Sequence, residues 1–167
     1  MERIDPPDSH YLSAAMGWTD LGNFAEAKAE LQKVASTLAH HPVVLEVAWA
    51  IHAGAKDWAE ALKAAEQLVA HAGEHASGWL HRAYAMRRAP GGGIKAAWDA
   101  LLPAVDQFPG ESTIPYNLAC YACQMGDLEE ARRWLRRALA VGEKGRIKTM
   151  ASADADLQPL WPEIKSL

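Results

Sequence analysis

The sequence has few of the residues on which several large classes of protein depend. Only two cysteines occur, so the chain is not a scaffold held together by disulfides. Val, Ile and Thr together number 17 against 33 Ala, which favours helix over an extended sheet, because β-branched side chains lose χ1 freedom in a helix. No apolar run reaches the roughly 18 residues of a membrane-spanning helix.

The first residues and the net charge are also informative. The first ten residues contain acidic side chains and two prolines but no apolar segment, so we expect no secretory signal and a cytoplasmic location. A net charge of -4 predicts no general attraction to nucleic acid or to a membrane. Half of the residues are hydrophobic and 23% are charged, which is typical of a globular chain, and the length favours a single domain over residues 1–167.

Three short segments share one pattern, an Asn or Asp followed three residues later by Glu and then Ala. They begin at Asn23, Asp57 and Asp127. The pattern predicts a helix start, at which the Asx side chain accepts a first-turn N–H and the Glu reaches back to the N–H of the cap residue. Gly22 and Gly126 precede two of these starts, as expected where a preceding helix ends in a left-handed residue. Each pattern therefore predicts a turn between two helices.

The spacing of the turns indicates a repeat. The Ala that closes each pattern falls at positions 27, 61 and 131, which are intervals of 34 and 70. A missing copy is expected between the last two, and Ala97 with Leu101 and Ala104 on one helical face supplies it, while a Pro and three Gly at 90–93 replace its cap and add two residues. The sequence thus predicts four helical hairpins, at approximately 9–41, 42–75, 76–111 and 112–145.

These hairpins resemble the units of the tetratricopeptide repeat family, which have this period. The best-matched runs are Trp79-Ala83-Ala97-Leu101-Pro109 and Tyr116-Asn117-Leu118-Ala119 with Gly126-Asp127. Two departures are visible: Trp49 stands where the family has a small residue, and Pro42 follows three residues late, which predicts a longer second helix in the first repeat. The resemblance implies an all-α, right-handed solenoid that binds a protein partner on the concave face formed by the first helices.

The apolar face of the last hairpin needs a cover, and residues 147–167 are suited to supply it. Apolar side chains recur there at three- and four-residue steps, at Leu157, Leu160, Trp161, Ile164 and Leu167. Asp154 or Asp156 can cap such a helix. We expect a short terminal helix over the last repeat, with a partner-binding tail as the alternative.

The residues available for chemistry are few. Cys120 and Cys123 lie on one face of a helix more than one turn from its start, where the dipole activates a thiol little. Zinc needs two further ligands, and His81 is the one plausible donor. We therefore expect packing side chains and no metal or cofactor; a metal- or redox-active protein using these thiols is the alternative. No Ser, His and Asp arrangement and no phosphate loop is recognisable, so we expect no catalytic residue and no enzyme.

The candidate partner-binding residues lie on the first helices and point away from the stacking positions. They are Leu12, Met16, Glu46, Leu80, Tyr84, Arg87, Arg88, Tyr116, Asn117, Cys120 and Gln124. Aromatic, Met and Arg side chains are typical of binding hot spots, and the Arg fork suits carboxylates. The predicted partner is therefore a protein or peptide segment with acidic and apolar residues, bound where the third and fourth hairpins meet.

Nucleic acid and a second copy of the chain are two other candidate partners. Four arginines on the second helix of the last hairpin form a candidate anion-binding strip, at Arg132, Arg133, Arg136 and Arg137. Because second helices form the outer surface of such repeats, we interpret this strip as a solvated face and expect no nucleic acid. Self-association into a homodimer that buries the groove stays open as a further alternative.

Overall fold

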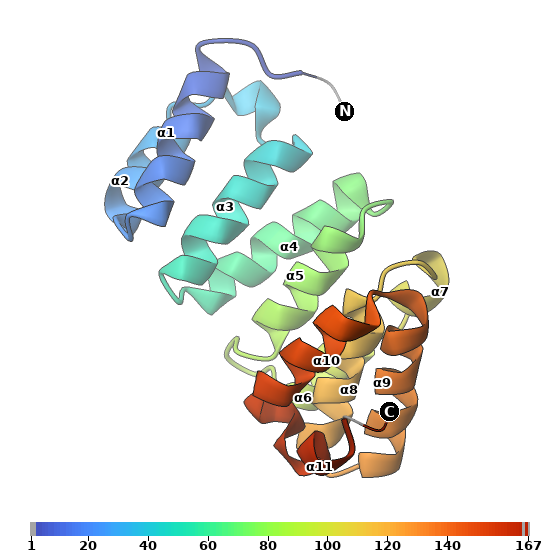
Figure 1. Cartoon of the computed structure of the whole chain (residues 1–167). Coiled ribbons are helices and arrows are strands. Elements are labelled where there is room, and N and C mark those ends of the chain that lie inside the picture. Colours follow the sequence, from blue (N-terminus) through green and yellow to red (C-terminus); the bar gives the residue numbers. More distant parts are fainter. Residues whose placement is uncertain (1–2, 165, 167) are drawn as a thin grey trace. The chain divides into compact units, whose positions relative to one another are not determined.

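In the computed structural model of this chain, which describes residues 3–164 and 166, every regular element is a helix (Figure 1). The all-helical class predicted from the excess of Ala over β-branched residues is therefore confirmed. The chain forms two compact units, Met1–Gly91 and Gly92–Leu167. Each unit has its own buried apolar side chains.

Consecutive helices pack against one another in the first unit. It contains α1 (Asp8–Asp20), α2 (Phe24–Leu31), the 3-10 helix η1 (Ser36–Leu38), α3 (Pro42–Gly54), α4 (Trp58–Ala72) and α5 (Ala76–Met86). α1 with α2 and α3 with α4 form the first two predicted hairpins, and α5 packs against α4. Leu12, Val47 and Ile51 lie at the centre of the core of α1 to α3, with Phe24 and Leu31 packed against it.

The second unit is built around α8. It contains α6 (Ile94–Leu101), α7 (Ala104–Gln107), α8 (Thr113–Gln124), α9 (Leu128–Val141), α10 (Lys144–Ala153), the 3-10 helix η2 (Ala155–Leu160) and α11 (Trp161–Ile164). α8 and α9 form the fourth predicted hairpin, and α6 packs against α8. The two helices predicted for the third hairpin are both present, but α5 belongs to the first unit and α6 to the second. The single domain predicted for residues 1–167 stays a prediction.

Three turns between paired helices share one set of hydrogen bonds. The second residue after the first helix of each pair has a positive φ. It is 75° at Gly22, 59° at Lys56 and 83° at Gly126. The following residue donates its N–H to the carbonyl five positions earlier, at 2.9, 2.8 and 3.0 Å for Asn23, Asp57 and Asp127. This is the Schellman arrangement for ending a helix. Because the N–H of the cap residue is used in this way, the prediction that a Glu reaches back to it was wrong.

The predicted helix caps form at two of the three turns. Asn23 accepts the N–H of Glu26 at 3.3 Å, and Asp127 accepts the N–H of Glu130 at 3.0 Å, which confirms both caps. The third cap, predicted at Asp57, forms no full hydrogen bond, and the N–H of Glu60 makes only a weaker interaction with the carboxylate, which helps to lower the pKa of Asp57. Its carboxylate instead lies 3.2 Å from His52 Nδ1 and 3.6 Å from Lys28 Nζ.

The second helix of the third repeat is interrupted, whereas the sequence predicted one continuous face. α6 ends at Leu101, and Ala104 begins the separate helix α7. Pro103 lies between them and has no N–H to donate, and its ring obstructs the preceding helical turn. Ala97, Leu101 and Ala104 are nevertheless fully buried, so the predicted apolar face survives the break.

The second helix of the first repeat is short, although the late position of Pro42 predicted a long one. α2 ends at Leu31, after which Lys33 and Val34 donate their N–H groups to carbonyls three residues back. The N–H of Ala35 then binds the carboxylate of Asp8 at 2.8 Å. The chain therefore leaves the helix through a tight turn that is fixed to the start of α1.

The C-terminal segment covers α8 and α9, as predicted, but it does so as three short helices rather than one. The carboxylate of Asp154 accepts the N–H of Asp156 at 3.0 Å and starts η2, which confirms the predicted cap. Leu157, Leu160 and Ile164 are at most 1% exposed. Trp161 is 39% exposed, so its predicted place on the buried face was wrong. Leu167 lies outside the described residues.

The left-handed residue at Lys56 yields a stability prediction. An L side chain costs about 1–2 kcal/mol in this conformation, and Gly avoids that cost but gains entropy in the unfolded chain. We expect Lys56→Gly to raise the free energy of unfolding by about 0.5–1 kcal/mol in urea denaturation followed by circular dichroism. Gly126→Ala should lower it by about 1 kcal/mol, since nothing lies within 4 Å of an added Cβ and only the backbone is strained. Equal stability of wild type and Lys56→Gly would contradict this account of the turn.

Candidate protein-binding surface

Four ring side chains from three helices of the first unit form one aromatic cluster. His81 on α5 stacks on Trp49 on α3, with 3.6 Å between ring centroids and 11° between planes. Tyr84, one turn further along α5, meets Trp49 edge-on at 6.2 Å and Trp58 at the start of α4 at 5.8 Å. Tyr84 is 40% exposed, so the cluster reaches the surface of the unit. Such rings supply large contact area at low entropic cost.

Arg88 is held against this cluster one turn after Tyr84. The centre of its guanidinium lies 3.6 Å from the Tyr84 ring centroid and 5.3 Å from that of Trp58. One of its Nη atoms donates to the Tyr84 carbonyl at 3.0 Å. A guanidinium has five N–H donors, so this ordered side chain can also bind a carboxylate of a partner. Stacking on the Tyr84 ring therefore holds the Arg88 guanidinium in position in the absence of a ligand.

Glu46 is the acidic member of the surface, and its charge is already hydrogen-bonded within the unit. It accepts Ser77 Oγ at 2.6 Å and pairs with His81 Nε2 at 2.7 Å. Burial raises the pKa of the Glu46 carboxyl, but the hydrogen bonds from His81 and Ser77 outweigh burial, so that the pKa lies below its ordinary value. The pair also orients the His81 ring that stacks on Trp49.

A shallow depression of about 390 Å³ adjoins the aromatic cluster. Its walls come from α1, α3 and α5 and consist of Met16, Val43, Glu46, Val47, Trp49, Ala50 and His81. Met16 and Val43 are 39% and 38% exposed, so both apolar side chains are accessible at the depression. The indole N–H of Trp49 is shielded from solvent and has no hydrogen-bond partner among the described residues. We call Met16, Trp49, Trp58, His81, Tyr84 and Arg88 the Tyr84 surface.

The first unit brings together several of the residues predicted to bind a partner. Met16 and Glu46 line the depression, and Tyr84 and Arg88 lie beside it. Among the other predicted residues of this unit, Leu12 packs in the core at 5% exposure, and Leu80 and Arg87 are half-buried.

The remaining predicted residues belong to α8 in the second unit, where the C-terminal segment lies over them. Tyr116 and Cys120 are 7% and 3% exposed, and Gln124 binds the Asp156 carbonyl. Asn117 donates to the Thr113 carbonyl of its own helix at 2.8 Å. The convergence of Tyr84 and Arg88 with Tyr116 and Asn117 stays a prediction, because the two sets belong to separate units.

Sequence reasoning missed Trp49, Trp58 and His81 as members of the surface. Trp49 was visible as a departure from the repeat pattern, and that departure was the available signal. Trp58 follows a helix cap, and His81 suggested only a metal ligand, so neither pointed to an aromatic cluster. Their rings meet because α3, α4 and α5 pack together, which spacing along the chain does not reveal.

The cysteine pair has surroundings unlike those of an activated thiol. Neither Cys120 nor Cys123 is in a disulfide, and both are buried. Burial raises the pKa of the Cys123 thiol, and the carboxylates of Asp156 and Asp154 raise it further. A redox pair needs the opposite shift, towards the thiolate. The described residues contain no group of three or more His, Cys, Asp or Glu side chains suited to a metal ion.

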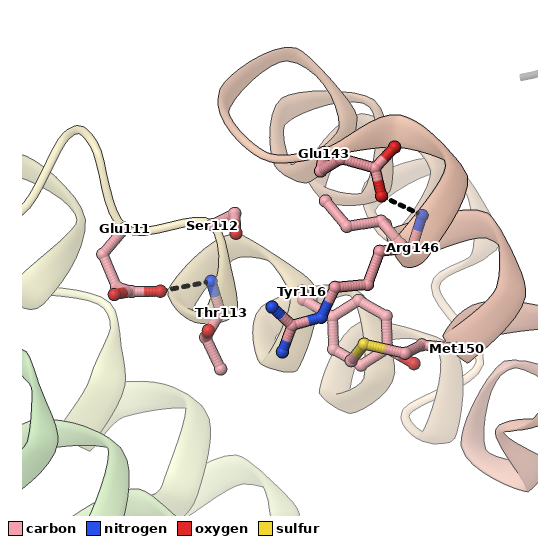
Figure 2. A pocket seen from close by; sticks show the side chains of 8 residues that line it. Glu111, Ser112, Thr113, Tyr116, Glu143, Arg146 and Met150 are labelled. Carbon is pink, nitrogen blue, oxygen red and sulfur yellow. Dashed lines mark hydrogen bonds between the residues drawn. The ribbon is translucent and has the colours of Figure 1, made fainter.

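Figure 2 shows a more polar pocket of about 280 Å³ in the second unit, between the starts of α8 and α10. Glu111 accepts the N–H of Thr113 at 2.9 Å, and Glu143 accepts that of Arg146 at 2.6 Å. The chain's own carboxylates thus cap both helix ends. Because Arg146 and the two glutamates face the same pocket, it favours no single class of ligand.

The arginine strip of α9 is largely engaged in contacts within the second unit. Arg132 pairs with Glu129 and Glu163, Arg133 pairs with Glu130, and Arg137 donates to the Val105 carbonyl at 3.4 Å. These pairs neutralise most of the positive charge that a phosphate backbone would need. Residues 3–164 also contain no helix long and apolar enough to cross a membrane.

Comparison with known proteins supports the repeat. A sequence model of the tetratricopeptide repeat matches residues 116–144, which span most of α8 and α9. The fold is similar to that of the crystal structure of MamA, with a TM-score of 0.70 and 16% identity over 95% of this chain and 86% of that one. It is also similar to a thermophilic TPR protein in Thermus thermophilus, with a TM-score of 0.66 and 16% identity over 96% and 100% of the two chains. No curated protein matches the chain in sequence.

The Glu46 contacts predict how stability depends on pH. Because the folded-state pKa of Glu46 is lowered, its contribution is complete above the usual value near 4.5 and is lost as pH falls through the folded-state pKa. We expect wild type to be more stable than Glu46→Gln at about pH 6 and the difference to shrink by about pH 3 in thermal unfolding. A constant difference for Glu46→Gln across this range would exclude the linkage.

Proposed function

We propose that this chain, which is a tetratricopeptide repeat protein, is a non-enzymatic scaffold that binds a protein or peptide segment through its Tyr84 surface. The single observation that supports this most is the ordered stack of Arg88, Tyr84 and Trp58 beside an apolar depression. Aromatic residues, Met and Arg together form the composition of binding hot spots. Among the described residues that make up this surface, none is a Ser or Cys nucleophile paired with a base.

The chemistry of the Tyr84 surface favours a particular kind of segment. The depression is lined mainly by apolar side chains and suits an apolar side chain of the partner, which would pack against Met16, Val47 and Trp49. The guanidinium of Arg88, at the other side of the ring cluster, suits a carboxylate. The expected segment therefore carries an apolar residue close to an acidic one.

Glu46 offers little attraction to a basic segment of a partner. Its carboxylate already accepts hydrogen bonds from Ser77 and His81, so it has little need of a cationic partner. A basic segment would meet the Arg88 guanidinium and lose more than it gains at Glu46. We therefore propose that the Tyr84 surface prefers an acidic and apolar segment, as the arginines and aromatic residues predicted.

The test is to select binding peptides from a displayed random library on the intact chain and to titrate the selected peptides by calorimetry. We expect them to combine acidic and apolar residues. Tyr84→Ala and Arg88→Glu should each weaken binding by about 1–3 kcal/mol, or about 5- to 150-fold, because each removes a central contact. Circular dichroism and thermal unfolding should show that both variants remain folded.

Lys63→Glu is the matched charge reversal. Lys63 lies on α4 and pairs with Glu60, and its side chain is 67% exposed. This change should leave the affinity within a factor of about two, since exposed residues outside an interface contribute little. Loss of binding in Lys63→Glu with unchanged binding in Tyr84→Ala and Arg88→Glu would move the partner to the second-helix face and refute the proposal.

A further inference from the structure

The C-terminal segment binds a row of predicted partner-binding side chains on α8. Tyr116 Oη donates to Asp154 Oδ2 at 2.9 Å, and the Cys120 thiol donates to the same oxygen at 3.6 Å. Gln124 Nε2 donates to the Asp156 carbonyl at 3.3 Å. The three α8 side chains are spaced four residues apart and so form one stripe along the helix. A segment from the end of the chain thus contacts all three side chains and covers Tyr116 and Cys120, while Gln124 stays exposed.

A matching stripe occurs at the equivalent positions of the third repeat, along α5 and just after its end. Two of its residues belong to the Tyr84 surface. The residues 36 positions before the α8 stripe, one 34-residue period plus the two added residues of the loop at 90–93, are Leu80, Tyr84 and Arg88. On α5 the middle residue is exposed, whereas on α8 the corresponding Cys120 is covered. The chain therefore contains two versions of one stripe, one open and one occupied by its own residues.

The occupying segment has the chemistry expected of a partner. It begins with an acidic turn in which Asp154 presents its carboxylate to α8, and it continues with Leu157 and Leu160, both fully buried. This combination of carboxylate and apolar contacts is the one proposed for the ligand of the Tyr84 surface. The segment was predicted as a cover for the last repeat, with a partner-binding tail as the alternative, and its contacts with α8 and α9 are those of a cover.

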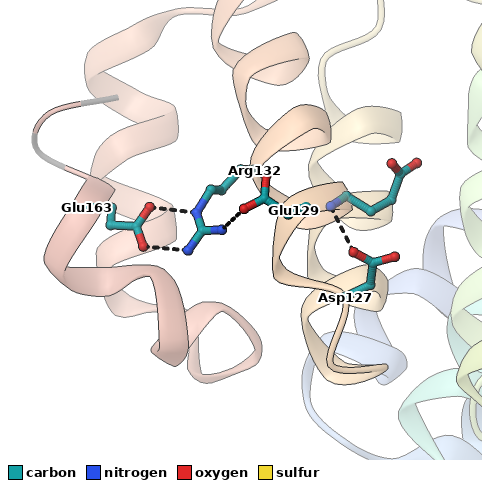
Figure 3. Close-up of polar contacts among 5 residues, drawn as sticks. Asp127, Glu129, Arg132 and Glu163 are labelled. Atoms are coloured by element: carbon teal, nitrogen blue, oxygen red, sulfur yellow. Dashed lines mark hydrogen bonds and ion pairs between the residues drawn. The ribbon is translucent and has the colours of Figure 1, made fainter.

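The hydrogen bonds that join the segment to α8 and α9 include those of four side chains on these two helices, Tyr116, Cys120, Gln124 and Arg132. η2 is a 3-10 helix, which has poorer hydrogen-bond geometry than an α-helix, and its bonds are local. Its far end is fixed by Glu163, whose carboxylate accepts two hydrogen bonds from Arg132 at 2.7 and 2.8 Å (Figure 3). Departure of residues 154–164 breaks no backbone hydrogen bond within α8 or α9.

We propose that residues 154–164 are a resident ligand of the α8 stripe and detach as a unit while α8 and α9 stay folded. Detachment exposes Tyr116 and Cys120, and releases the Gln124 amide, for a partner segment that has an acidic turn followed by apolar residues. Only the identity of that partner depends on the proposed function. The detachment itself is a local opening of the kind that native proteins undergo below the free energy of global unfolding.

The buried thiols report the opening without any partner. Cys120 and Cys123 are 3% and 5% exposed, so a water-soluble thiol reagent reaches them only after the cover leaves or the chain unfolds. We expect the labelling rate of the full chain to be independent of urea at low concentrations, as for a local opening, and to exceed the rate of global unfolding. A labelling rate that follows the urea dependence of global unfolding overturns the proposal.

Arg132 provides a matched pair of variants, because it pairs with Glu163 on the segment and with Glu129 on its own helix (Figure 3). Glu163→Gln removes the contact that fixes the segment and should raise the labelling rate about fivefold. Glu129→Gln removes a neighbouring pair of the same charge type and should leave the rate within about a factor of two. Equal rates in the two variants refute the role of the segment as a detachable ligand.

A synthetic peptide of residues 152–164 tests whether the open stripe binds a ligand in trans. Added in excess to Glu163→Gln, it should compete for the open state and slow the thiol labelling, whereas a scrambled peptide of the same composition should not. Absence of slowing, or equal slowing by the scrambled peptide, overturns the ligand assignment. Failure here leaves the Tyr84→Ala and Arg88→Glu titrations unaffected, so the two proposals fail separately.

Discussion

Close contact through alanine is the interaction on which the rest of the structure depends. Ala27, Ala61, Ala97 and Ala131, which recur in the second helix of each repeat, are all completely buried. A side chain of one carbon allows the helix to approach its neighbour closely, and larger residues at these positions would force the axes apart. Each contact fixes which side of a first helix faces inward, and so also which side is left for a partner.

That constraint explains why the stripe at α5 is exposed whereas the similar stripe on α8 is covered. The outward side of α5 carries the exposed Tyr84, and the half-buried Arg88, just after the helix end, stacks on its ring. On α8 the outward side carries Tyr116 and Cys120, whose polar atoms meet the carboxylate of Asp154. The last repeat has no successor to cover it, so the chain supplies a cover from its own C-terminal residues. The cover uses the polar side chains of the stripe as well as its apolar ones.

The sequence was sufficient to predict the paired helices, the turns and the caps at Asn23 and Asp127, because these depend on residues close together in the chain. It was less informative where a local rule competed with the repeat. Pro103 breaks the helix that Ala97, Leu101 and Ala104 predicted. Asp57 pairs with His52 and Lys28 and caps α4 only weakly. The aromatic cluster was not predictable from spacing, since it requires three helices to meet, and it supplies the candidate surface with Trp49, Trp58 and His81.

Site-specific photo-cross-linking tests the central claim, that the Tyr84 surface binds a partner segment, most directly. A photoreactive amino acid is placed at position 84 in one version of the intact chain and at position 63 in another, and the cross-linked peptides formed in the native host are sequenced by mass spectrometry. The account predicts that position 84 joins to a protein segment rich in acidic and apolar residues, and that position 63 does not. Cross-links to a common partner from position 63 alone would contradict it.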